Sequence, residues 1–144
     1  MPTPFPHHYE VSLEAGYGEG VVSSDTRPPL LVGAPPEFDG RAGVWSPEHL
    51  LVSALAVCHY TTFEFLARRA GLEVRDYHAS ARAELAKTKD GLAFTRFELE
   101  VTLDVPPESA ELALRLLQNA KDHCLVAGAL KAPVVLRSVV RRAA

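Results

Sequence analysis

Cysteine is scarce in this chain, which has Cys58 and Cys124 as its only two in 144 residues, too few for a disulfide framework. An excess of positive charge is also missing, because 15 Lys and Arg residues stand against 18 Asp and Glu residues. Nucleic acids and anionic membranes are bound through such an excess, so we expect neither as a partner.

Signals for export, membrane insertion and nucleotide binding are missing as well. The opening residues MPTPFPHHYE have no basic run followed by an apolar stretch, and we expect no apolar segment long enough to cross a bilayer. The sequence has no phosphate-binding loop and no dinucleotide fingerprint. We therefore expect one cytoplasmic domain over residues 1–144 that uses no cofactor.

Metal binding is the first function that the cysteines suggest, because His59 follows Cys58 and His123 precedes Cys124. Cysteine and histidine are the usual ligands of zinc. However, neighbouring residues of a helix point about 100° apart, so Cys58 and His59 are badly placed to hold one ion. We expect no metal site.

The longest helical signal runs from Trp45 to Leu72. Ser46 is suited to cap its start, Pro47 to occupy the first position, and Gly71 to end it. Apolar residues recur between these ends at spacings of three and four and leave a narrow polar stripe, which predicts a core helix covered on most sides. The row predicted to point inward is Leu51, Leu55, Cys58, Thr62 and Phe65.

Alternation of apolar and polar residues predicts strands before and after this helix. The expected strands cover residues 9–17, 21–22, 30–32, 77–85, 96–105 and 134–140. An irregular loop is expected over 33–44, and a hairpin turn at Asp90–Gly91. A second helix is expected from Pro106 to His123, with Cys124 facing inward and a break at Gly128. This order of elements is typical of an α+β fold.

Two segments resemble a known family. In SPEHLLVSALAVC, Glu48 stands ten residues ahead of the mid-helix Cys58, and KDHCLVAGAL surrounds Cys124. Together with the order of the elements, these segments resemble the OsmC/Ohr family of thiol-dependent hydroperoxide reductases. The resemblance implies an OsmC-like α+β fold, with antiparallel sheets packed around a long central helix in an intertwined homodimer.

The resemblance also implies roles for individual residues. Cys58 would be the peroxidatic cysteine, Cys124 the resolving cysteine, and Glu48 the carboxylate that holds an activating arginine. At the positions that the family uses, this chain has no arginine, which leaves Arg41 and Arg27 as nearby candidates, and Arg41 is the predicted one. The implied partners are an organic hydroperoxide and a dithiol reductant.

Helix geometry adds an argument for a dimer. Ten residues of helix span about 15 Å, so Glu48 and Cys58 of one chain are too far apart to meet. If Glu48 supports a cysteine, directly or through Arg41, we expect that cysteine to be Cys58 of a second chain.

Three functions from different classes remain open. The first is a peroxidase that oxidises Cys58 to a sulfenic acid and resolves it with Cys124. The second is an OsmC-fold redox sensor or small-molecule-binding protein without peroxidase turnover. The third is a structural protein with inert thiols. The separation of the two sulfur atoms and the position of the nearest guanidinium distinguish these alternatives.

Overall fold

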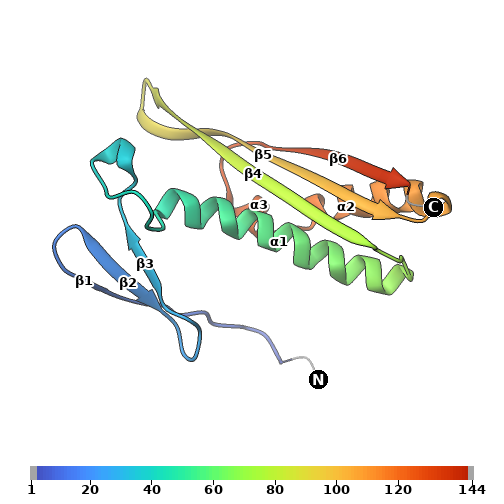
Figure 1. Cartoon of the computed structure of the whole chain (residues 1–144), viewed down its shortest axis with the longest axis horizontal. Coiled ribbons are helices and arrows are strands. Elements are labelled where there is room, and N and C mark those ends of the chain that lie inside the picture. Colours follow the sequence, from blue (N-terminus) through green and yellow to red (C-terminus); the bar gives the residue numbers. More distant parts are fainter. Residues whose placement is uncertain (1–2, 143–144) are drawn as a thin grey trace. The chain divides into compact units, whose positions relative to one another are not determined.

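The computed structural model describes residues 3–142 and shows two compact units, one ending at Leu50 and the other starting at Leu51 (Figure 1). Each unit has its own three-stranded sheet. The predicted α+β class is confirmed, while the single domain expected over residues 1–144 stays a prediction.

The N-terminal unit is an antiparallel meander. Its strands β1 (Ser12–Ala15), β2 (Glu19–Ser23) and β3 (Leu30–Gly33) pair in chain order. Gly18 provides the turn between β1 and β2 with a φ of 86°, a conformation that favours glycine. The first strand is shorter than predicted, and the loop expected over 33–44 contains the single 3-10 turn η1 (Pro36–Phe38).

Helix α1 (Pro47–Ala70) begins and ends where the sequence predicts. The Ser46 Oγ accepts a hydrogen bond from the His49 backbone N–H at 3.1 Å, and the same oxygen lies 2.6 Å from His49 Nδ1. At the other end, Gly71 has a φ of 68°, the left-handed conformation that ends helices. Local hydrogen bonding therefore fixes both ends.

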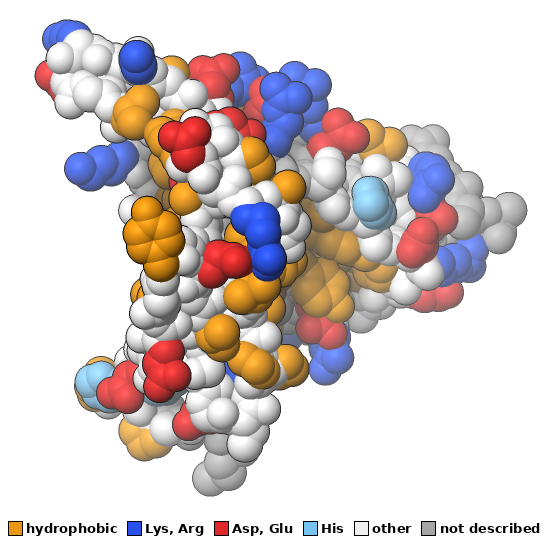
Figure 2. Space-filling view, turned by 60° about the vertical axis from the view of Figure 1, so that its left-hand side comes forward, with side chains coloured by type: hydrophobic (Ala, Val, Ile, Leu, Met, Phe, Trp, Pro, Cys, Tyr) orange, Lys and Arg blue, Asp and Glu red, His pale blue; other side chains and the backbone are white. Residues whose placement is uncertain are grey.

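The buried row of α1 differs from the predicted row. The residues that are buried are Leu55, His59, Phe63 and Ala67. Phe65, predicted to point inward, is 58% exposed, and its ring lies 5.6 Å from the Arg69 guanidinium carbon. Val57 is 59% exposed, so α1 is not covered on most sides in the single chain. Figure 2 shows hydrophobic side chains (orange) at the surface among charged ones. The buried face of α1 was mispredicted because apolar residues lie almost all round the helix, so their spacing does not indicate which face is buried.

The length and composition of α1 contradict one expectation from the sequence. The helix has 24 residues, and its mean hydropathy reaches 1.5 over a window of 18, which is long and apolar enough to cross a membrane. Length and composition alone do not separate such a segment from the core helix of a soluble protein. In this structure the buried row of α1 packs against the C-terminal sheet.

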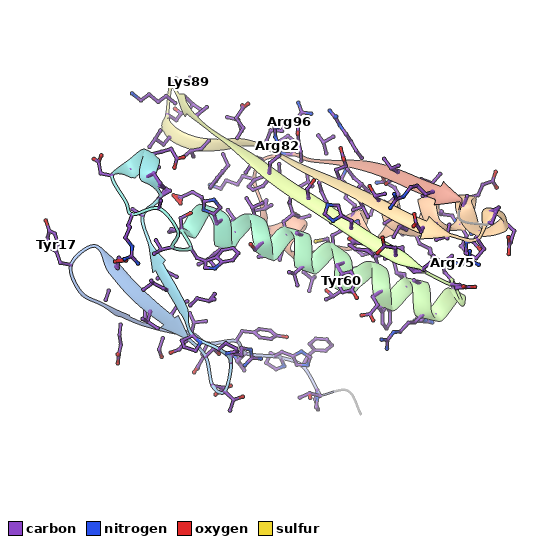
Figure 3. The ribbon with its side chains drawn as sticks, viewed as in Figure 1. Tyr17, Tyr60, Arg75, Arg82, Lys89 and Arg96 are labelled. Carbon is purple, nitrogen blue, oxygen red and sulfur yellow. The ribbon has the colours of Figure 1, made fainter. Side chains whose placement is uncertain are left out.

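The C-terminal sheet contains β4 (Asp76–Thr88), β5 (Gly91–Val105) and β6 (Val134–Arg142) in that order. Strands β4 and β5 form the predicted hairpin, with Lys89 at its tip (Figure 3). Its two-residue turn is Lys89–Asp90 rather than the predicted Asp90–Gly91, because Gly91, at a φ of 109°, pairs with Thr88 and starts the return strand. Strand β6 runs parallel to β5. The sheet is therefore mixed rather than wholly antiparallel as predicted.

Parallel pairing requires a long crossover, and residues 106–133 provide it. They form η2 (Pro107–Ser109), α2 (Ala110–Asp122) and the short α3 (Leu125–Ala129). The predicted break at Gly128 is wrong, because Gly128 lies inside α3. Glycine costs about 1 kcal/mol in a helix interior, and tertiary packing overrides a preference of that size.

The helices of the C-terminal unit cover one face of its sheet (Figure 1). Alternate residues of β5 are completely buried there, and they pack against Phe63 of α1 and Leu117 of α2. The buried residues of β5 in this core are Leu99, Val101, Leu103 and Val105. The core therefore fixes the position of α1 beside α2.

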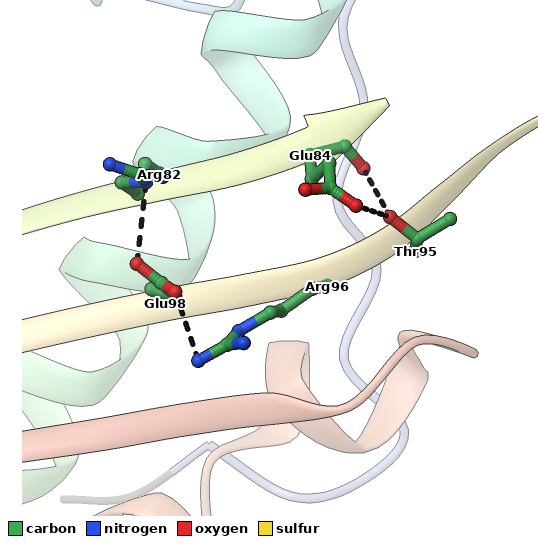
Figure 4. A network of polar contacts seen from close by, with 5 residues as sticks. All are labelled: Arg82, Glu84, Thr95, Arg96 and Glu98. Atoms are coloured by element: carbon green, nitrogen blue, oxygen red, sulfur yellow. Dashed lines mark hydrogen bonds and ion pairs between the residues drawn. The ribbon is translucent and has the colours of Figure 1, made fainter. Parts of the chain in front are cut away.

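The opposite face of the sheet is polar. The Glu98 carboxylate lies 3.3 Å from Arg82 and 3.0 Å from Arg96, and the Thr95 hydroxyl donates to Glu84 Oε1 at 2.6 Å (Figure 4). Thr95 is the extra residue of a β-bulge, since the register of the hairpin shifts at Glu84. This face carries solvated ion pairs, each of small energetic effect.

Candidate functional site at the Cys58 and Cys124 thiols

The two cysteines of the chain meet inside the C-terminal unit. Cys58 lies in the middle of α1, and Cys124 is the residue that caps the start of α3. Both are free thiols, they pack in one hydrophobic cluster, and each affects the pKa of the other. Cys124 is 4% exposed and packs with the buried side chains of Leu55 and Phe97, while Cys58 is half-buried beside them. The predicted inward orientation of Cys124 is confirmed.

Four hydrogen-bond donors surround the Cys58 sulfur. The donors, in decreasing order of their effect on the pKa of Cys58, are the Val126 N–H, the Cys124 thiol, the Leu125 N–H and the Thr62 hydroxyl. Burial raises the pKa of the Cys58 thiol, but these donors stabilise the thiolate. The donors together outweigh burial, so the pKa of Cys58 lies below its ordinary value.

The pKa of the Cys124 thiol is raised above its ordinary value. Burial raises the pKa of its thiol first, and the neighbouring Cys58 raises it further through the shared hydrogen bond and its negative charge. The Ala127 N–H donates to the Cys124 sulfur at 3.4 Å and offsets only part of this effect. The two groups titrate as a coupled pair in which Cys58 ionises first and Cys124 keeps its proton.

The histidines beside the cysteines are engaged elsewhere. His59 is completely buried, and its Nε2–H donates to the Leu117 carbonyl oxygen at 3.0 Å. His123 is exposed, with Nδ1 2.8 Å from the Asn119 carbonyl oxygen. Residues 3–142 contain no group of three His, Cys, Asp or Glu side chains arranged to hold a metal ion.

Acid is expected to destabilise the protein through His59. Burial lowers the pKa of the His59 imidazole below its ordinary value of 6.5, because the charged form is poorly solvated in the core. The unfolded chain therefore binds more protons, so the stability contributed by neutral His59 is present above pH 6.5 and is lost as pH falls through the lowered pKa. Denaturant titrations should show the free energy of unfolding falling by up to about 1.4 kcal/mol per pH unit in this window.

The matched control for this titration is His59→Gln. Glutamine keeps an N–H that can reach the Leu117 carbonyl and does not titrate. We expect its free energy of unfolding to depend less steeply on pH below 6.5 than that of the unchanged protein. Equal slopes in the two proteins would show that His59 is not the responsible group.

The predicted charged residues of the site belong to the N-terminal unit. Glu48 lies in the first turn of α1, and its Oε2 atom is buried with no hydrogen-bond partner among residues 3–142. Arg41 Nη2 lies 2.9 Å from Glu19 Oε2, so Arg41 pairs with β2 rather than with Glu48. Arg27, the other candidate, lies 3.7 Å from Asp25 in the turn after β2. The site roles of Glu48 and Arg41 stay predictions.

Sequence reasoning missed most of the groups that contact the Cys58 sulfur. The amides of Leu125 and Val126 reach it because α3 begins immediately after Cys124. The sequence did not predict α3, because Gly128 was expected to break the helix there. The sequence predicts Thr62 in the inward row, and its position four residues after Cys58 puts the two side chains on the same face of a helix.

Comparison with known proteins agrees with this fold. The family model described as OsmC-like protein matches residues 40–138. The uncharacterized protein YmaD of Bacillus subtilis (strain 168) is 24% identical over 110 residues, which are 74% of this chain and 73% of the relative.

Two solved structures are also similar. An OsmC-like protein of unknown function from Vibrio cholerae aligns with a TM-score of 0.81 at 19% identity, covering 92% of this chain and 100% of the other. An organic hydroperoxide resistance protein from Elizabethkingia anophelis aligns with a TM-score of 0.73 at 18% identity, covering 96% of this chain and 100% of the other. At these identities the two structures show a shared fold.

Proposed function

We propose, since this chain belongs to the OsmC-like protein family, that it is a thiol-dependent peroxidase that reduces organic hydroperoxides. The observation that carries the proposal is the packing of Cys58 with Cys124 in one cluster, in which the pKa of Cys58 is lowered and that of Cys124 is raised. The Elizabethkingia anophelis relative, named an organic hydroperoxide resistance protein, supports the substrate class.

The first step of the proposed reaction oxidises Cys58. Its thiolate attacks the terminal oxygen of the hydroperoxide, a sulfur–oxygen bond forms, and the oxygen–oxygen bond breaks. The sulfur loses two electrons and becomes a sulfenic acid, and the departing alkoxide takes a proton to become an alcohol. The Cys124 thiol, hydrogen-bonded to Cys58, is the proton donor next to the reaction. Its loss of this proton makes Cys124 a thiolate.

The second step joins the two cysteines. The Cys124 thiolate attacks the Cys58 sulfur, a disulfide forms, and the hydroxide that leaves is protonated to water. The contact between the thiols in the reduced protein supports this step. An external dithiol then supplies two electrons, restores both thiols and is itself oxidised to a disulfide.

The proposal includes a second chain at each site. A buried carboxylate oxygen without a partner is costly, and Glu48 Oε2 is such an atom among residues 3–142. We propose that Glu48, with Arg41, supports Cys58 of a partner chain in a homodimer. We also propose that the protein acts in the cytoplasm, without binding nucleic acid or a membrane.

A peroxide-consumption assay on the purified protein with dithiothreitol tests this function. The thiols lie in a cluster that includes Leu51, Val52, Leu55 and Phe97. Each CH₂ buried against such a surface is worth about 0.8 kcal/mol, so we expect kcat/KM to rise about fourfold for each CH₂ added to a short alkyl hydroperoxide. Hydrogen peroxide should be the poorest substrate.

The outcomes of the assay separate the alternatives. Equal turnover of hydrogen peroxide and a bulky alkyl hydroperoxide would show that the apolar cluster does not select the substrate. Oxidation of both thiols by one equivalent of hydroperoxide, with no further turnover when dithiothreitol is present, would instead favour a redox sensor.

A further inference from the structure

We infer that Thr62 is a positioning residue for Cys58, whose hydroxyl turns its single proton from the Cys58 carbonyl oxygen to the Cys58 sulfur when that sulfur is ionised. The inference rests on the proposed function only in taking the Cys58 thiolate as the reactive species. It adds a side chain that neither the family resemblance nor the predicted site contains.

The geometry of α1 places the Thr62 hydroxyl between two acceptors. Thr62 follows Cys58 by four residues, and its Oγ1 donates to the Cys58 carbonyl oxygen at 2.8 Å. Residues four apart on a helix lie on the same face, so the Thr62 side chain stands beside that of Cys58, and it lowers the pKa of the Cys58 thiol as a hydrogen-bond donor. A threonine hydroxyl has only one proton and rotates freely, so it serves one of these acceptors at a time.

The Cys58 carbonyl can lose this donor at little cost. It lies inside α1, where the backbone N–H four residues on satisfies it. The Thr61 hydroxyl also donates to the same oxygen, at 3.1 Å. A thiolate is a charged acceptor, and hydrogen bonds to charged acceptors are the stronger ones. Ionisation of Cys58 therefore favours rotation of the Thr62 hydroxyl toward the sulfur.

Thr62 differs from the other donors to this sulfur. The Leu125 and Val126 amides depend on the position of α3, and the Cys124 thiol gives up its proton in the proposed reaction. The Thr62 hydroxyl keeps its proton through both steps. It is also held by the helix that carries Cys58, so the distance between hydroxyl and sulfur does not depend on the rest of the site.

The test measures the rate of iodoacetamide alkylation of Cys58 against pH in the full-length protein, with mass spectrometry to separate Cys58 from Cys124. Thr62→Val removes the hydroxyl and preserves the shape of the side chain. We expect its alkylation profile to move to higher pH by about one unit, which is about tenfold less thiolate at a fixed pH below the midpoint.

Three further variants control this result. Thr62→Ser keeps the hydroxyl and should restore the wild-type midpoint, and Thr62→Ala should reproduce the shift if valine disturbs folding. Thr61→Val removes an exposed hydroxyl from the same carbonyl and should leave the midpoint unchanged. Thermal unfolding of each variant separates a change in stability from a change in ionisation.

Two results would overturn the inference. One is a Thr62→Val midpoint equal to that of the unchanged protein, and the other is an equal shift in Thr61→Val. Alkylation requires no hydroperoxide, so a protein without peroxidase activity can still show the Thr62 effect. An active peroxidase without the shift would overturn the inference alone.

Discussion

Replacing Cys58 with serine is expected to abolish hydroperoxide reduction, whereas replacing Cys124 with serine is expected to leave one turnover per site. Cys58 has the lowered pKa and is therefore the nucleophile of the pair, and a serine hydroxyl cannot form a sulfenic acid. Without Cys124, the oxidised Cys58 has no thiol to condense with, so it accumulates as a sulfenic acid and is oxidised further by excess hydroperoxide.

Intact-protein mass spectrometry after one equivalent of an alkyl hydroperoxide checks both expectations. The Cys124→Ser protein should gain one oxygen atom, and the unchanged protein should lose two hydrogens as the disulfide forms. A protein that carries both Cys58→Ser and Cys124→Ser should not react. An oxygen adduct on Cys124 of the Cys58→Ser protein, formed at the wild-type rate, would reverse the two roles.

The second prediction concerns the oligomeric state of the protein. We expect the protein to be a homodimer in solution, with twice the 15.7 kDa mass of the chain. In the C-terminal unit, α1 leaves Val57 and Phe65 exposed, and in the N-terminal unit one sheet carries an apolar hollow of about 440 Å³. The apolar residues of this hollow include Val11, Leu13, Val22, Val32 and Leu50. A three-stranded sheet with an apolar face requires a second layer.

Val57→Asp tests whether the exposed face of α1 is the interface. A charge buried without a partner costs several kcal/mol, and about 1.4 kcal/mol corresponds to a tenfold change in affinity. We therefore expect the dissociation constant to rise at least about a hundredfold, which sedimentation velocity at low micromolar concentration would detect as monomer.

Val139→Asp is the matched control for this substitution. Val139 is 46% exposed and pairs with Thr102 on the opposite face of the sheet, so the same substitution should leave a dimer there. Monomeric wild-type protein with full peroxidase activity would contradict the proposal. A Val57→Asp protein that dimerises as strongly as the Val139→Asp protein would show that the interface lies elsewhere.

The ends of α1 and the β4–β5 hairpin were predictable because nearby residues determine them. Ser46 and Gly71 act through hydrogen bonding and backbone conformation within one turn of the helix, and Asp90 acts within the two-residue connection that precedes Gly91. The buried face of α1 was not predictable in the same way. His59 is buried because α2 supplies the Leu117 carbonyl as its acceptor, a contact between residues far apart in the sequence.

In the candidate site, too, some features were predictable from the sequence and others depend on contacts between distant residues. The family resemblance identified Cys58 and Cys124, and the structure brings these two thiols together. The amides that surround Cys58 were not predictable, because a five-residue helix containing Gly128 has too short a pattern to detect. The position of Arg41 in the sequence does not show its pairing with Glu19, because that pairing depends on the register of β2 and on the loop after β3.

The parallel pairing of β6 with β5 has a consequence for the order in which the molecule assembles. The β4–β5 hairpin needs only a two-residue connection, so it can close as soon as both strands have left the ribosome. Strand β6 can dock only after the crossover over residues 106–133 has been made, and closing that loop is slower. Cys124 lies within this crossover. During synthesis, Cys58 therefore emerges before its partner thiol, and the pair is completed among the last steps of folding.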